Sequence, residues 1–500
     1  MKKLLFIFGC LVLLSTCQTA PRVVYPGEVI NLQDVLAMAQ VRREGIIRPS
    51  REAVLALVHE REAPTIDLGQ LFSRECQSID ISYQEAIEDF TVFSDVIRQL
   101  YGAYHYFGGD EVFLPIFEEI TNTLAAQTNW AVSDFAELIF DSLEDIITDK
   151  HFMINERHMG NWYDFFVPDN GVNAVFDRIG NRFRNRQTGL FVEDILFENT
   201  SLANELDSIF RLSMDSNGRF YYSIVIVRRR DAQTTANLTI LYENGRQANL
   251  SVSPINPEVL PFEDSSLRYV YGFPIVTVRQ MGFPDSVYGW GSEDARRFLA
   301  IAEELQDEPV VIVDIRSNGG GNATLPIRWL HILTGEIVPT NFWGVTWGWS
   351  YEDFISIVGD DNPNNPFHIP YKIFHRYLVP EPLGPLHFLR HAHEDKIVSN
   401  NQLLIILTDR WSGSGADKFT DLAFNLSNAL VIGQNTFGAL HTDMTFTRLY
   451  LPNSGMLFGF GTGIHLHPPG HLPEGIGIAP DIWVNGDALE AVLAMLNREF

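Results

Sequence analysis

The sequence predicts an α/β protein in which a layered α/β core follows an N-terminal helical region and a middle β-rich segment. Two observations lead to this fold class. Toward the C-terminus, short aliphatic runs alternate with amphipathic stretches, which is typical of strands covered by helices. Before that section, apolar residues first recur at helical spacing and then change to strand-like runs. A chain of 500 residues, 46% of them hydrophobic, can bury two or three cores.

The first 17 residues are expected to be an export signal and not part of the fold. Lys2 and Lys3 precede the apolar run Leu4–Leu14, which is too short for a comfortable membrane span. Leu14-Ser-Thr-Cys17 resembles a bacterial lipobox, which implies lipidation at Cys17 and a membrane anchor there. Gln18 follows the cysteine and favours the outer membrane over the inner one, on the periplasmic or the surface side. A simple cleaved secretory signal is the alternative, and either signal predicts a cell-envelope location.

The cysteine count, the hydropathy and the net charge each exclude one property of the mature chain. The cysteines are Cys10, Cys17 and Cys76, and two of them belong to the export signal, so the mature chain cannot form an internal disulfide. Beyond the signal there is no long uncharged apolar segment, and the rest is expected to be soluble. The net charge of −27 would repel nucleic acid, so no nucleic-acid partner is expected.

Residues 18–154 are expected to hold a spacer and the helical region. Residues 18 to about 65 predict an exposed spacer with one short helix. From Ser82 to Phe152 apolar residues recur at helical spacing, and they predict several packed helices. The last of these is expected to end near Asp149-Lys-His151.

Residues 155–260 predict the β-rich segment. Tyr221–Val227 and Leu238–Tyr242 have strand-like composition. Glu243-Asn-Gly-Arg246 contains an Asn-Gly pair, which predicts a hairpin turn from Leu238–Tyr242 to Ala248–Val252.

Residues 261–500 predict the α/β core, with an amphipathic helix over Ser292–Leu305. Its strands are expected at Ile275–Val278, Val310–Ile315, Leu403–Leu407 and Leu430–Gly433. A loop-rich insertion at about 341–400 carries Trp343, Trp347, Trp349, Phe354, Tyr371 and many prolines. Because long loops in compact domains are often functional, this insertion is expected to be a lid or substrate flap, or else a packing subdomain.

A glycine-rich turn directly follows the strand at Val310–Ile315. Its glycines, Gly319, Gly320 and Gly321, let backbone N–H groups point into a cavity without interference from side chains. Such a turn can bind a phosphate, form an oxyanion hole or be purely structural. The phosphate-binding glycine motifs are not present in it. We therefore favour an oxyanion hole with Gly320 or Gly319 as a donor.

Ser414 follows another buried strand, Leu403–Leu407, and stands at the start of a predicted helix. A serine at this position is often only a helix cap. A strand-to-helix turn nevertheless exposes the hydroxyl, and it directs the N–H of Gly415 to where an oxyanion would form. The two turns could thus supply donors to one carbonyl oxygen.

Five segments of the chain resemble, in order, the motifs of the S41 serine peptidases, which include the C-terminal processing proteases and the tricorn protease core. The segments are Asp314-Ile-Arg-Ser-Asn-Gly-Gly-Gly321, Ser414-Gly-Ala-Asp417, Val431-Ile-Gly-Gln-Asn-Thr-Phe-Gly438, Leu451-Pro-Asn-Ser-Gly455 and Glu474-Gly-Ile-Gly-Ile-Ala-Pro-Asp481. The resemblance covers roughly the last half of the chain, together with Asp149-Lys-His151. It implies a crotonase-like core of the ClpP/crotonase type and a serine endopeptidase that needs no cofactor and acts on peptides or proteins.

The same resemblance implies a base for Ser414. In the processing-protease branch a lysine follows the Thr-x-Gly turn, and Ala439 occupies that position here. The tricorn-like branch uses a histidine and a glutamate, and His151 and Glu474 match them. His151 would accept the Ser414 proton, and Glu474 would orient the imidazole. Lys150 stands where tricorn has a serine that assists the site, so that role has no match.

Further residues are expected to support the site or to offer alternatives to it. Asp314 and Arg316 are expected to pair and, with Asn318, to hold the oxyanion turn. Lys418 is a rival base on the nucleophile helix. A rival of another class is a non-catalytic ligand- or peptide-binding lipoprotein on the S41 fold. Gly189-Leu-Phe-Val192 faintly resembles a PDZ carboxylate loop, so the middle segment is either a divergent PDZ-like domain or an unrelated β-rich spacer.

Two histidine clusters do not show the spacing of a metal site, and no metal is expected. They are His387, His391 and His393, and His465, His467 and His471. The sequence gives no indication of an oligomeric state.

Overall fold

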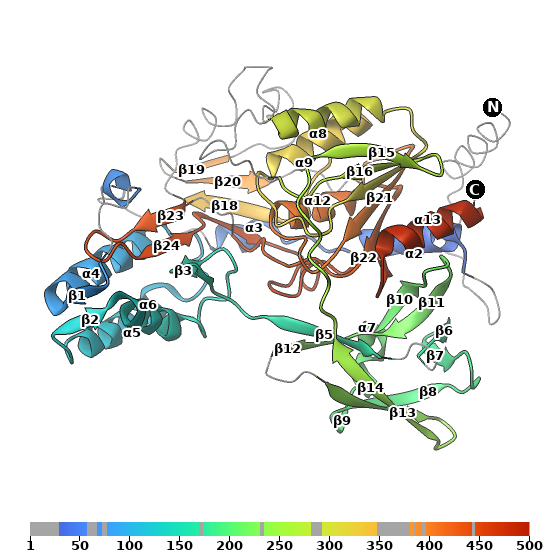
Figure 1. Cartoon of the computed structure of the whole chain (residues 1–500), viewed down its shortest axis with the longest axis horizontal. Helices are drawn as coiled ribbons and strands as arrows, with labels where there is room; N and C mark the ends of the chain where they lie inside the picture. The colour runs from blue at the N-terminus through green and yellow to red at the C-terminus, as the bar shows by residue number, and fades with distance from the viewer. Residues whose placement is uncertain are drawn as a thin grey trace.

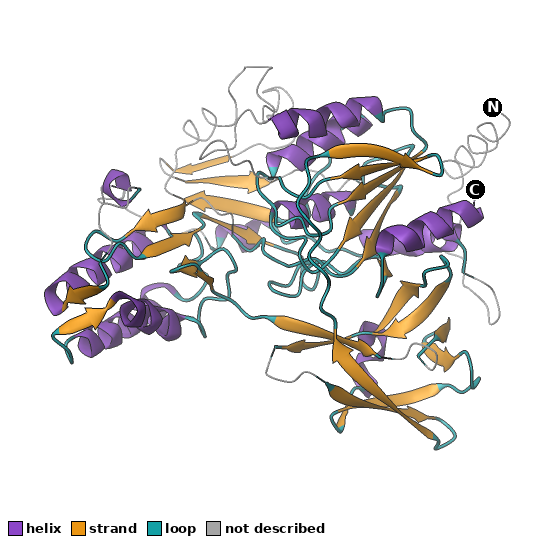
Figure 2. Cartoon of the chain, in the orientation of Figure 1, coloured by secondary structure: helices purple, strands orange, loops and turns teal. Residues whose placement is uncertain are grey.

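A computed structural model describes residues 30–57, 68–72, 78–169, 174–230, 235–281, 293–347, 381–384, 387–391, 397–442 and 446–499. The expected export signal with Cys17, and the insertion residues Trp349, Phe354, Tyr371 and His393, lie outside these ranges. Figure 1 shows the order of the elements, and Figure 2 shows a helical region, a layered core and a region made mostly of strands.

The core is built on a ten-stranded sheet with the order β15-β16-β17-β21-β22-β26-β10-β11-β6-β7. The strands from β16 to β10 are parallel to one another. The central strands β17, β21 and β22 are nearly continuous apolar runs because both faces of a parallel sheet are buried. The bounds are β15 Ser266–Val270, β16 Phe273–Thr277, β17 Val310–Asp314, β21 Leu403–Thr408, β22 Ala429–Gly433, β26 Ile482–Trp483, β10 Phe210–Met214, β11 Phe220–Ile224, β6 Phe176–Ile179 and β7 Arg182–Asn185. The four strands expected in the core are therefore confirmed, with ends shifted by one or two residues.

Helices cover both faces of this sheet (Figure 1). Val311 and Val313 of β17 pack toward one layer, which consists of α8 (Glu293–Glu304), α9 (Thr324–Thr334) and α12 (Gly415–Ala423). Val310 and Ile312 alternate with them and pack toward α2 (Leu32–Glu44) and α13 (Ala488–Glu499). Since successive strand residues point to opposite faces, one apolar strand can pack against the helices on both faces of the sheet. The layered α/β core is confirmed.

The prediction of an exposed spacer is wrong for the described residues between 30 and 57. They contain two helices, α2 and α3 (Arg51–Leu55), and Leu32 and Val35 are buried against the core. Arg43 is buried as well, and its guanidinium lies 2.9 Å from the carboxylate of Asp481. This ion pair spans most of the chain length, so local sequence pattern could not reveal it.

The predicted helical region contains α4 (Tyr83–Leu100), α5 (Gly109–Leu124) and α6 (Val132–Leu143), with the short strands β1 (Asp80–Ser82) and β2 (Asn129–Ala131). Their apolar faces meet in a core rich in phenylalanine, which confirms the helical spacing. The last helix ends at Leu143, earlier than expected, and a turn carries the chain to His151.

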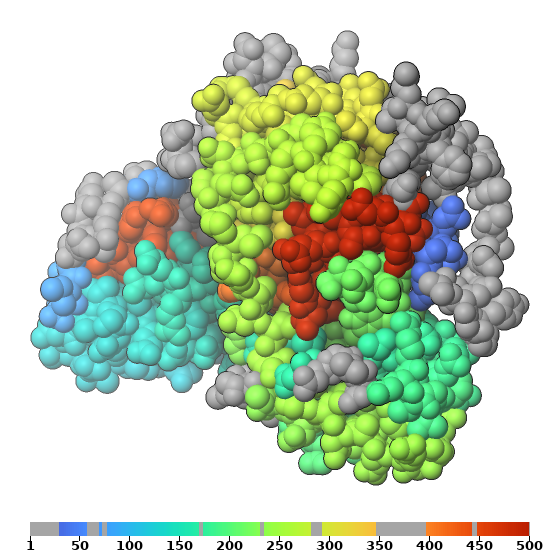
Figure 3. All heavy atoms as spheres, turned by 45° about the vertical axis from the view of Figure 1, so that its right-hand side comes forward, coloured from blue at the N-terminus to red at the C-terminus, as the bar shows by residue number. Residues whose placement is uncertain are grey.

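Two strands after this turn join the helical region to the C-terminal part of the chain. β3 (Met153–Ile154) pairs with β24 (Leu457–Phe460) in a sheet of order β23-β24-β3-β4, which also contains β23 (Phe446–Tyr450) and β4 (Arg157–His158). In Figure 3 the orange-red atoms of this C-terminal segment lie among the blue and teal atoms of the helical region. Residues far apart in the sequence are thereby brought together.

The middle segment forms a six-stranded sheet and also completes the core sheet. The six-stranded sheet has the order β12-β5-β14-β13-β8-β9. The predicted hairpin is confirmed, because Leu238 stands opposite Leu250. The expected strand Tyr221–Val227 is instead two strands that enter different sheets, since β11 ends at Ile224 and β12 starts at Ile226. The bounds are β12 Ile226–Arg229, β5 Tyr163–Pro168, β14 Gln247–Pro254, β13 Ala236–Tyr242, β8 Val192–Phe197 and β9 Thr200–Ser201, with η3 Ala203–Glu205 and α7 Leu206–Ile209 beside them.

The described part of the expected loop-rich insertion contains strands. β18 (Trp343–Trp347), β19 (Glu381–Gly384) and β20 (His387–His391) pair with β25 (Gly463–Leu466) in the order β19-β20-β18-β25. His387 and His391 thus stand at the ends of a strand and not in a loop. Across the described ranges, which also include η1 (Leu68–Leu71), no helix has the length and apolarity needed to cross a membrane.

Candidate active site

Ser414 stands in a sharp turn between β21 and α12. Its φ of 52° lies in a region that side-chain-bearing residues rarely adopt, which is common for residues at functional turns. The Ser414 N–H donates to Asp417 Oδ2 at 2.7 Å, and this bond helps to hold the strained turn. The hydroxyl is thereby presented at the helix N-terminus, as predicted from the strand-to-helix pattern.

His151 reaches this hydroxyl from the turn that follows α6. Its Nε2 lies 3.0 Å from Ser414 Oγ, although 263 positions separate the two residues. The imidazole is buried, at 5% exposure. The structure therefore brings together the predicted nucleophile and the predicted base at hydrogen-bond distance.

The turn at Asp149–His151, called the histidine turn below, is held by two carboxylates. They accept hydrogen bonds from consecutive backbone N–H groups of this turn. Asp149 Oδ1 accepts from the N–H of His151 at 2.9 Å, and Glu474 Oε1 accepts from the N–H of Lys150 at 2.9 Å. Asp149 is fully buried and also accepts the hydroxyls of Tyr101 and Thr442. These bonds tie the histidine turn to the helical region on one side and to the core on the other.

Glu474 does not hydrogen-bond to the imidazole that it was expected to orient. Its other oxygen accepts the backbone N–H groups of Leu440 and His441, at 3.3 and 3.1 Å. His151 Nδ1 is buried and makes no hydrogen bond with any described residue. Removal of the carboxylate from water, and then the negative charge of Asp149, raise the pKa of Glu474 well above its ordinary value. The carboxylate thus acts on the backbone of the histidine turn.

Two turns are predicted to form the oxyanion hole: the glycine-rich turn after β17 and the turn at Ser414. These two oxyanion turns lie in close contact. A Cβ added to Gly320 would come within 2.6 Å of Gly413 O, Gly415 N and the Ser414 side chain. The N–H of Gly320 already donates to Asn318 Oδ1 at 2.8 Å, so it is not available to an oxyanion in this arrangement. No described residue accepts the N–H of Gly415 or Gly319, which leaves these two as the candidate donors.

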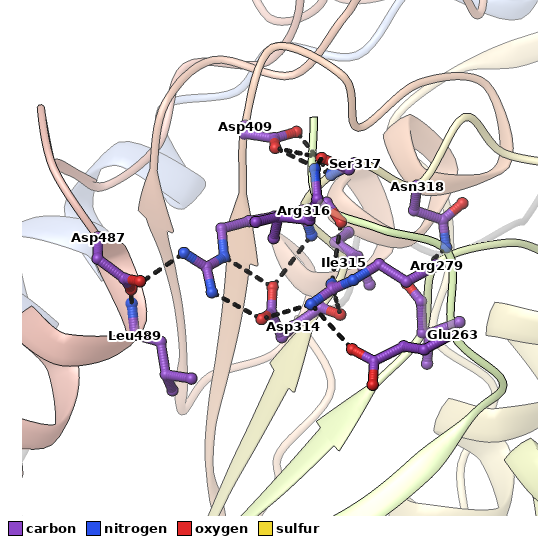
Figure 4. Close-up of polar contacts among 12 residues, drawn as sticks. Glu263, Arg279, Asp314, Ile315, Arg316, Ser317, Asn318, Asp409, Asp487 and Leu489 are labelled. Atoms are coloured by element: carbon purple, nitrogen blue, oxygen red, sulfur yellow. Dashed lines mark hydrogen bonds and ion pairs between the residues drawn. The ribbon is translucent and has the colours of Figure 1, made fainter. Parts of the chain in front are cut away.

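Asp314 and Arg316 pair as expected beneath the glycine turn (Figure 4). Arg316 Nε and Nη2 each lie 2.8 Å from one oxygen of Asp314, a bidentate arrangement, and Arg279 adds a third contact at 3.1 Å. Burial opposes ionisation of Asp314, but Arg316 and then Arg279 outweigh it and lower its pKa. Arg316 Nη1 reaches Asp487, which joins the turn to α13.

Asp409 connects the two oxyanion turns, and sequence reasoning did not single it out. Both of its oxygens accept the N–H of Ser317 at 2.9 Å (Figure 4). Its Oδ1 also accepts the hydroxyl of Ser412 at 3.1 Å. Gly413 N in turn donates to Asn318 O at 2.9 Å. An aspartate directly after a buried strand is a common turn former, and that was the available signal.

Asp417 is a second residue whose role the sequence did not indicate. Its Oδ2 accepts from Ser414 and Ala439, and its Oδ1 accepts from Gly438. The side chain is fully buried, and burial raises its pKa. It therefore fixes the nucleophile turn to the turn that begins at Thr436.

The rival base and the histidine clusters have other contacts. The ammonium of Lys418 lies 3.8 Å above the ring of Phe342, while the imidazole of His151 occupies the place beside Ser414 Oγ. His465 and His467 hydrogen-bond to Leu440 O, and His471 to Asp421. Within the part of the chain that the structure describes, no group of three His, Cys, Asp or Glu side chains could hold a metal ion.

Comparisons with known proteins place part of the chain in a family of peptidases. Residues 276–484 match the family model described as Peptidase family S41. No curated protein sequence matches the chain. Among solved structures, mature CPAF is 14% identical (TM-score 0.45) and aligns with 83% of this chain and 98% of its own. The photosystem II D1 C-terminal processing protease is 12% identical (TM-score 0.37) over 83% and 96%. The tricorn protease is 12% identical (TM-score 0.35) over 83% and 37%.

Proposed function

Because this chain is a peptidase of family S41, with residues 276–484 as the matched domain, we propose that it is an exported serine endopeptidase that works through an acyl-enzyme. Its substrates are peptides or proteins. The observation that carries the proposal is the 3.0 Å distance between Ser414 Oγ and His151 Nε2. A nucleophile within hydrogen-bond reach of a base is the requirement for covalent acyl transfer.

In the acylation step, Ser414 Oγ attacks the carbonyl carbon of the scissile bond while His151 Nε2 accepts the hydroxyl proton. The carbonyl π bond opens and its electron pair becomes the oxyanion. When the C–N bond breaks, His151 returns the proton to the leaving amine. Water then attacks the ester, His151 accepts the proton of this water, and Ser414 regains a proton as the acid product leaves.

The N–H groups of Gly415 and Gly319 are the proposed oxyanion donors. Both lie in the two turns that meet at Ser414, and each is left without an acceptor among the described residues. Donors that are already oriented cost no reorganisation when the charge develops. Asp314, Arg316 and Asn318 support this turn by the bonds described above.

Glu474 is proposed as the carboxylate of the triad, and it acts on the imidazole by charge and by position. It accepts the N–H of Lys150, next to His151 in the chain. An ionised carboxylate here stabilises the imidazolium that forms during acylation. Direct contact with imidazole Nδ1 is not made, so the carboxylate acts on the ring through its charge and through the backbone of the histidine turn.

Export and a lipid anchor at Cys17 complete the proposal, and they rest on the lipobox-like residues Leu14-Ser-Thr-Cys17. They place the peptidase in the cell envelope, anchored to the outer membrane.

The direct test uses an aryl fluorophosphonate, which reacts with an activated serine. The wild-type protein is expected to be labelled at Ser414 and to cleave peptides from a mixed library, and Ser414→Ala is expected to do neither. Equal labelling and equal cleavage by the two proteins would refute the proposal. Retained peptide binding without turnover in the wild type would favour a binding lipoprotein instead.

A further inference from the structure

The backbone at His151 sets the position of the imidazole ring. Nδ1 of the ring is buried and makes no hydrogen bond with any described residue, while Nε2 lies 3.0 Å from Ser414 Oγ. The distance between base and nucleophile therefore depends on where the main chain places His151. Because a displacement of about 1 Å can slow a reaction by about 100-fold, the contacts that hold this main chain affect the rate.

A buried carboxylate, that of Asp149, holds the main chain at His151. Its Oδ1 accepts the N–H of His151 at 2.9 Å. The hydroxyl of Tyr101 donates to Oδ2 at 3.0 Å, and the hydroxyl of Thr442 lies 3.1 and 2.9 Å from the two oxygens. The carboxylate is fully buried, so these hydroxyls take the place of water around it. Its direction is thus set by side chains from two other parts of the chain.

Tyr101 brings one of these hydroxyls from the helical region, and the main chain fixes its place. The residue directly follows α4, and it is fully buried. The N–H of the next residue, Gly102, donates to Gly461 O at 2.9 Å. A Cβ added to Gly102 would come within 2.5 Å of the main chain of Thr462. The helical region is therefore pressed against the C-terminal part of the chain at the point where Tyr101 reaches Asp149.

Thr442 brings the other hydroxyl from a short segment, Gly438–Thr442, that also holds the nucleophile. At the start of this segment, two N–H groups donate to Asp417, which accepts the N–H of Ser414 as well. At its end, the hydroxyl of Thr442 donates to Asp149. One short stretch of main chain therefore links the carboxylate that holds the serine turn to the carboxylate that holds His151.

We propose that Tyr101 and Thr442 are positioning residues for the reaction. Their hydroxyls hold Asp149, and Asp149 holds the main chain of His151 so that Nε2 stays within reach of Ser414 Oγ. They act through Asp149 and not on the reacting atoms. This role rests on the proposed function, because it concerns the base of the same reaction. It makes the N-terminal helical region a part of the catalytic machinery, since that region supplies Tyr101.

The first test compares Thr442→Val, which removes the hydroxyl, with Thr442→Ser, which keeps it. Labelling at a series of aryl fluorophosphonate concentrations separates the maximal rate, kinact, from the half-saturating concentration, KI. Thr442→Val is expected to lower kinact by about tenfold and to leave KI within about twofold, because binding does not require the base. Glu474 still holds the N–H of Lys150, so labelling is slowed and not abolished.

Thr442→Ser is expected to keep kinact within about twofold of the wild-type value, since its hydroxyl can still donate to Asp149. A wild-type kinact in Thr442→Val, or an equal loss in the Val and Ser variants, would overturn the proposal.

The second test is Tyr101→Phe, with Tyr104→Phe as the matched control. Tyr104 is also buried, and its hydroxyl also donates to an aspartate, Asp110, at 2.9 Å. Each variant loses one hydrogen bond of a buried phenol, so both are expected to unfold at a lower urea concentration. Only Tyr101→Phe is expected to lower kinact, by about fivefold. The same kinact in both variants would contradict the role of Tyr101.

These measurements separate positioning from a merely structural role, which would lower the urea midpoint and leave kinact unchanged. If Thr442→Val does not fold, Tyr101→Phe decides, because it removes a hydroxyl and leaves the ring. Wild-type labelling at Ser414 together with an unchanged kinact in the variants would overturn the positioning role alone. A wild type that is not labelled would refute the peptidase mechanism itself, so the two failures are distinguishable.

Discussion

Asp417 accepts the backbone N–H of Ser414 at 2.7 Å, from a side chain that is fully buried one turn into the nucleophile helix. The same carboxylate accepts the N–H groups of Gly438 and Ala439. Three donors converge on one side chain, so the unusual backbone of Ser414 is held from within its own helix.

Asp417→Asn is therefore expected to slow labelling of Ser414 by about 10- to 100-fold, because an amide nitrogen would face a backbone N–H and displace the turn. The variant is also expected to lose about 1–3 kcal/mol of unfolding free energy. Labelling kinetics and urea unfolding measure the two effects. Asp421→Asn is the matched control, since Asp421 is a buried aspartate on the same helix that bonds to His471 and Asn341. It is expected to lose stability but to keep the labelling rate.

Gly320→Ala is expected to abolish labelling, because the added methyl group would lie 2.6 Å from Gly413 O and Gly415 N. Its φ of 100° adds strain for any residue with a side chain. Gly319→Ala is the control, since no atom lies within 4 Å of the added methyl group and the backbone N–H is retained. It should fold and label normally. If both variants labelled alike, the close contact of the two turns would be disproved.

Stability is expected to depend on pH through His467. Burial lowers its pKa to about 3 in the folded protein, against about 6.5 in an unfolded chain. As the pH falls, the unfolded state binds a proton at His467 before the folded state does. The stability linked to the neutral form of His467 is therefore fully present above about pH 6.5 and is lost as the pH falls toward 3. The unfolding free energy changes with pH by at most about 1.4 kcal/mol per unit for one such group. The change is smaller here because part of the His467 side chain is exposed.

His467→Gln is expected to reduce the pH dependence of the unfolding free energy while it keeps a donor for Leu440 O. Urea unfolding at a series of pH values measures this dependence. His158→Gln replaces an exposed histidine and serves as the control. An unchanged slope in His467→Gln would mean that the acid sensitivity has another source.

Lipidation is expected at Cys17 and not at Cys10. The wild-type protein should incorporate labelled palmitate in cells and should leave the membrane fraction only with detergent. Cys17→Ser should lose both properties, and Cys10→Ser should retain them. A Cys17→Ser protein that still carried palmitate would rule out the anchor.

Local patterns predicted much of the core and the chemistry of the site. The strand at Leu403–Leu407 and the hairpin around Asn244-Gly245 depend on residues that are neighbours in sequence, so periodicity and turn chemistry were sufficient. The proximity of Ser414 and His151 came from the family resemblance, because no local pattern links residues so far apart.

What the sequence could not predict are long-range polar contacts. The spacer prediction failed because Arg43 is paired with Asp481, near the other end of the chain. Gly320 was expected as an oxyanion donor, yet the Asn318 side chain accepts its N–H. Glu474 faces backbone N–H groups of the histidine turn and not the imidazole ring. Each of these results depends on the direction of a single side chain, which composition and spacing do not determine.

The pairing of β3 with β24 beside the histidine turn has a consequence for shortened forms of the protein. Met153 and Ile154, directly after the base, have their strand partners at Gly459 and Phe458. A truncation before Leu457 would therefore remove the strand that supports the base, in addition to removing Glu474.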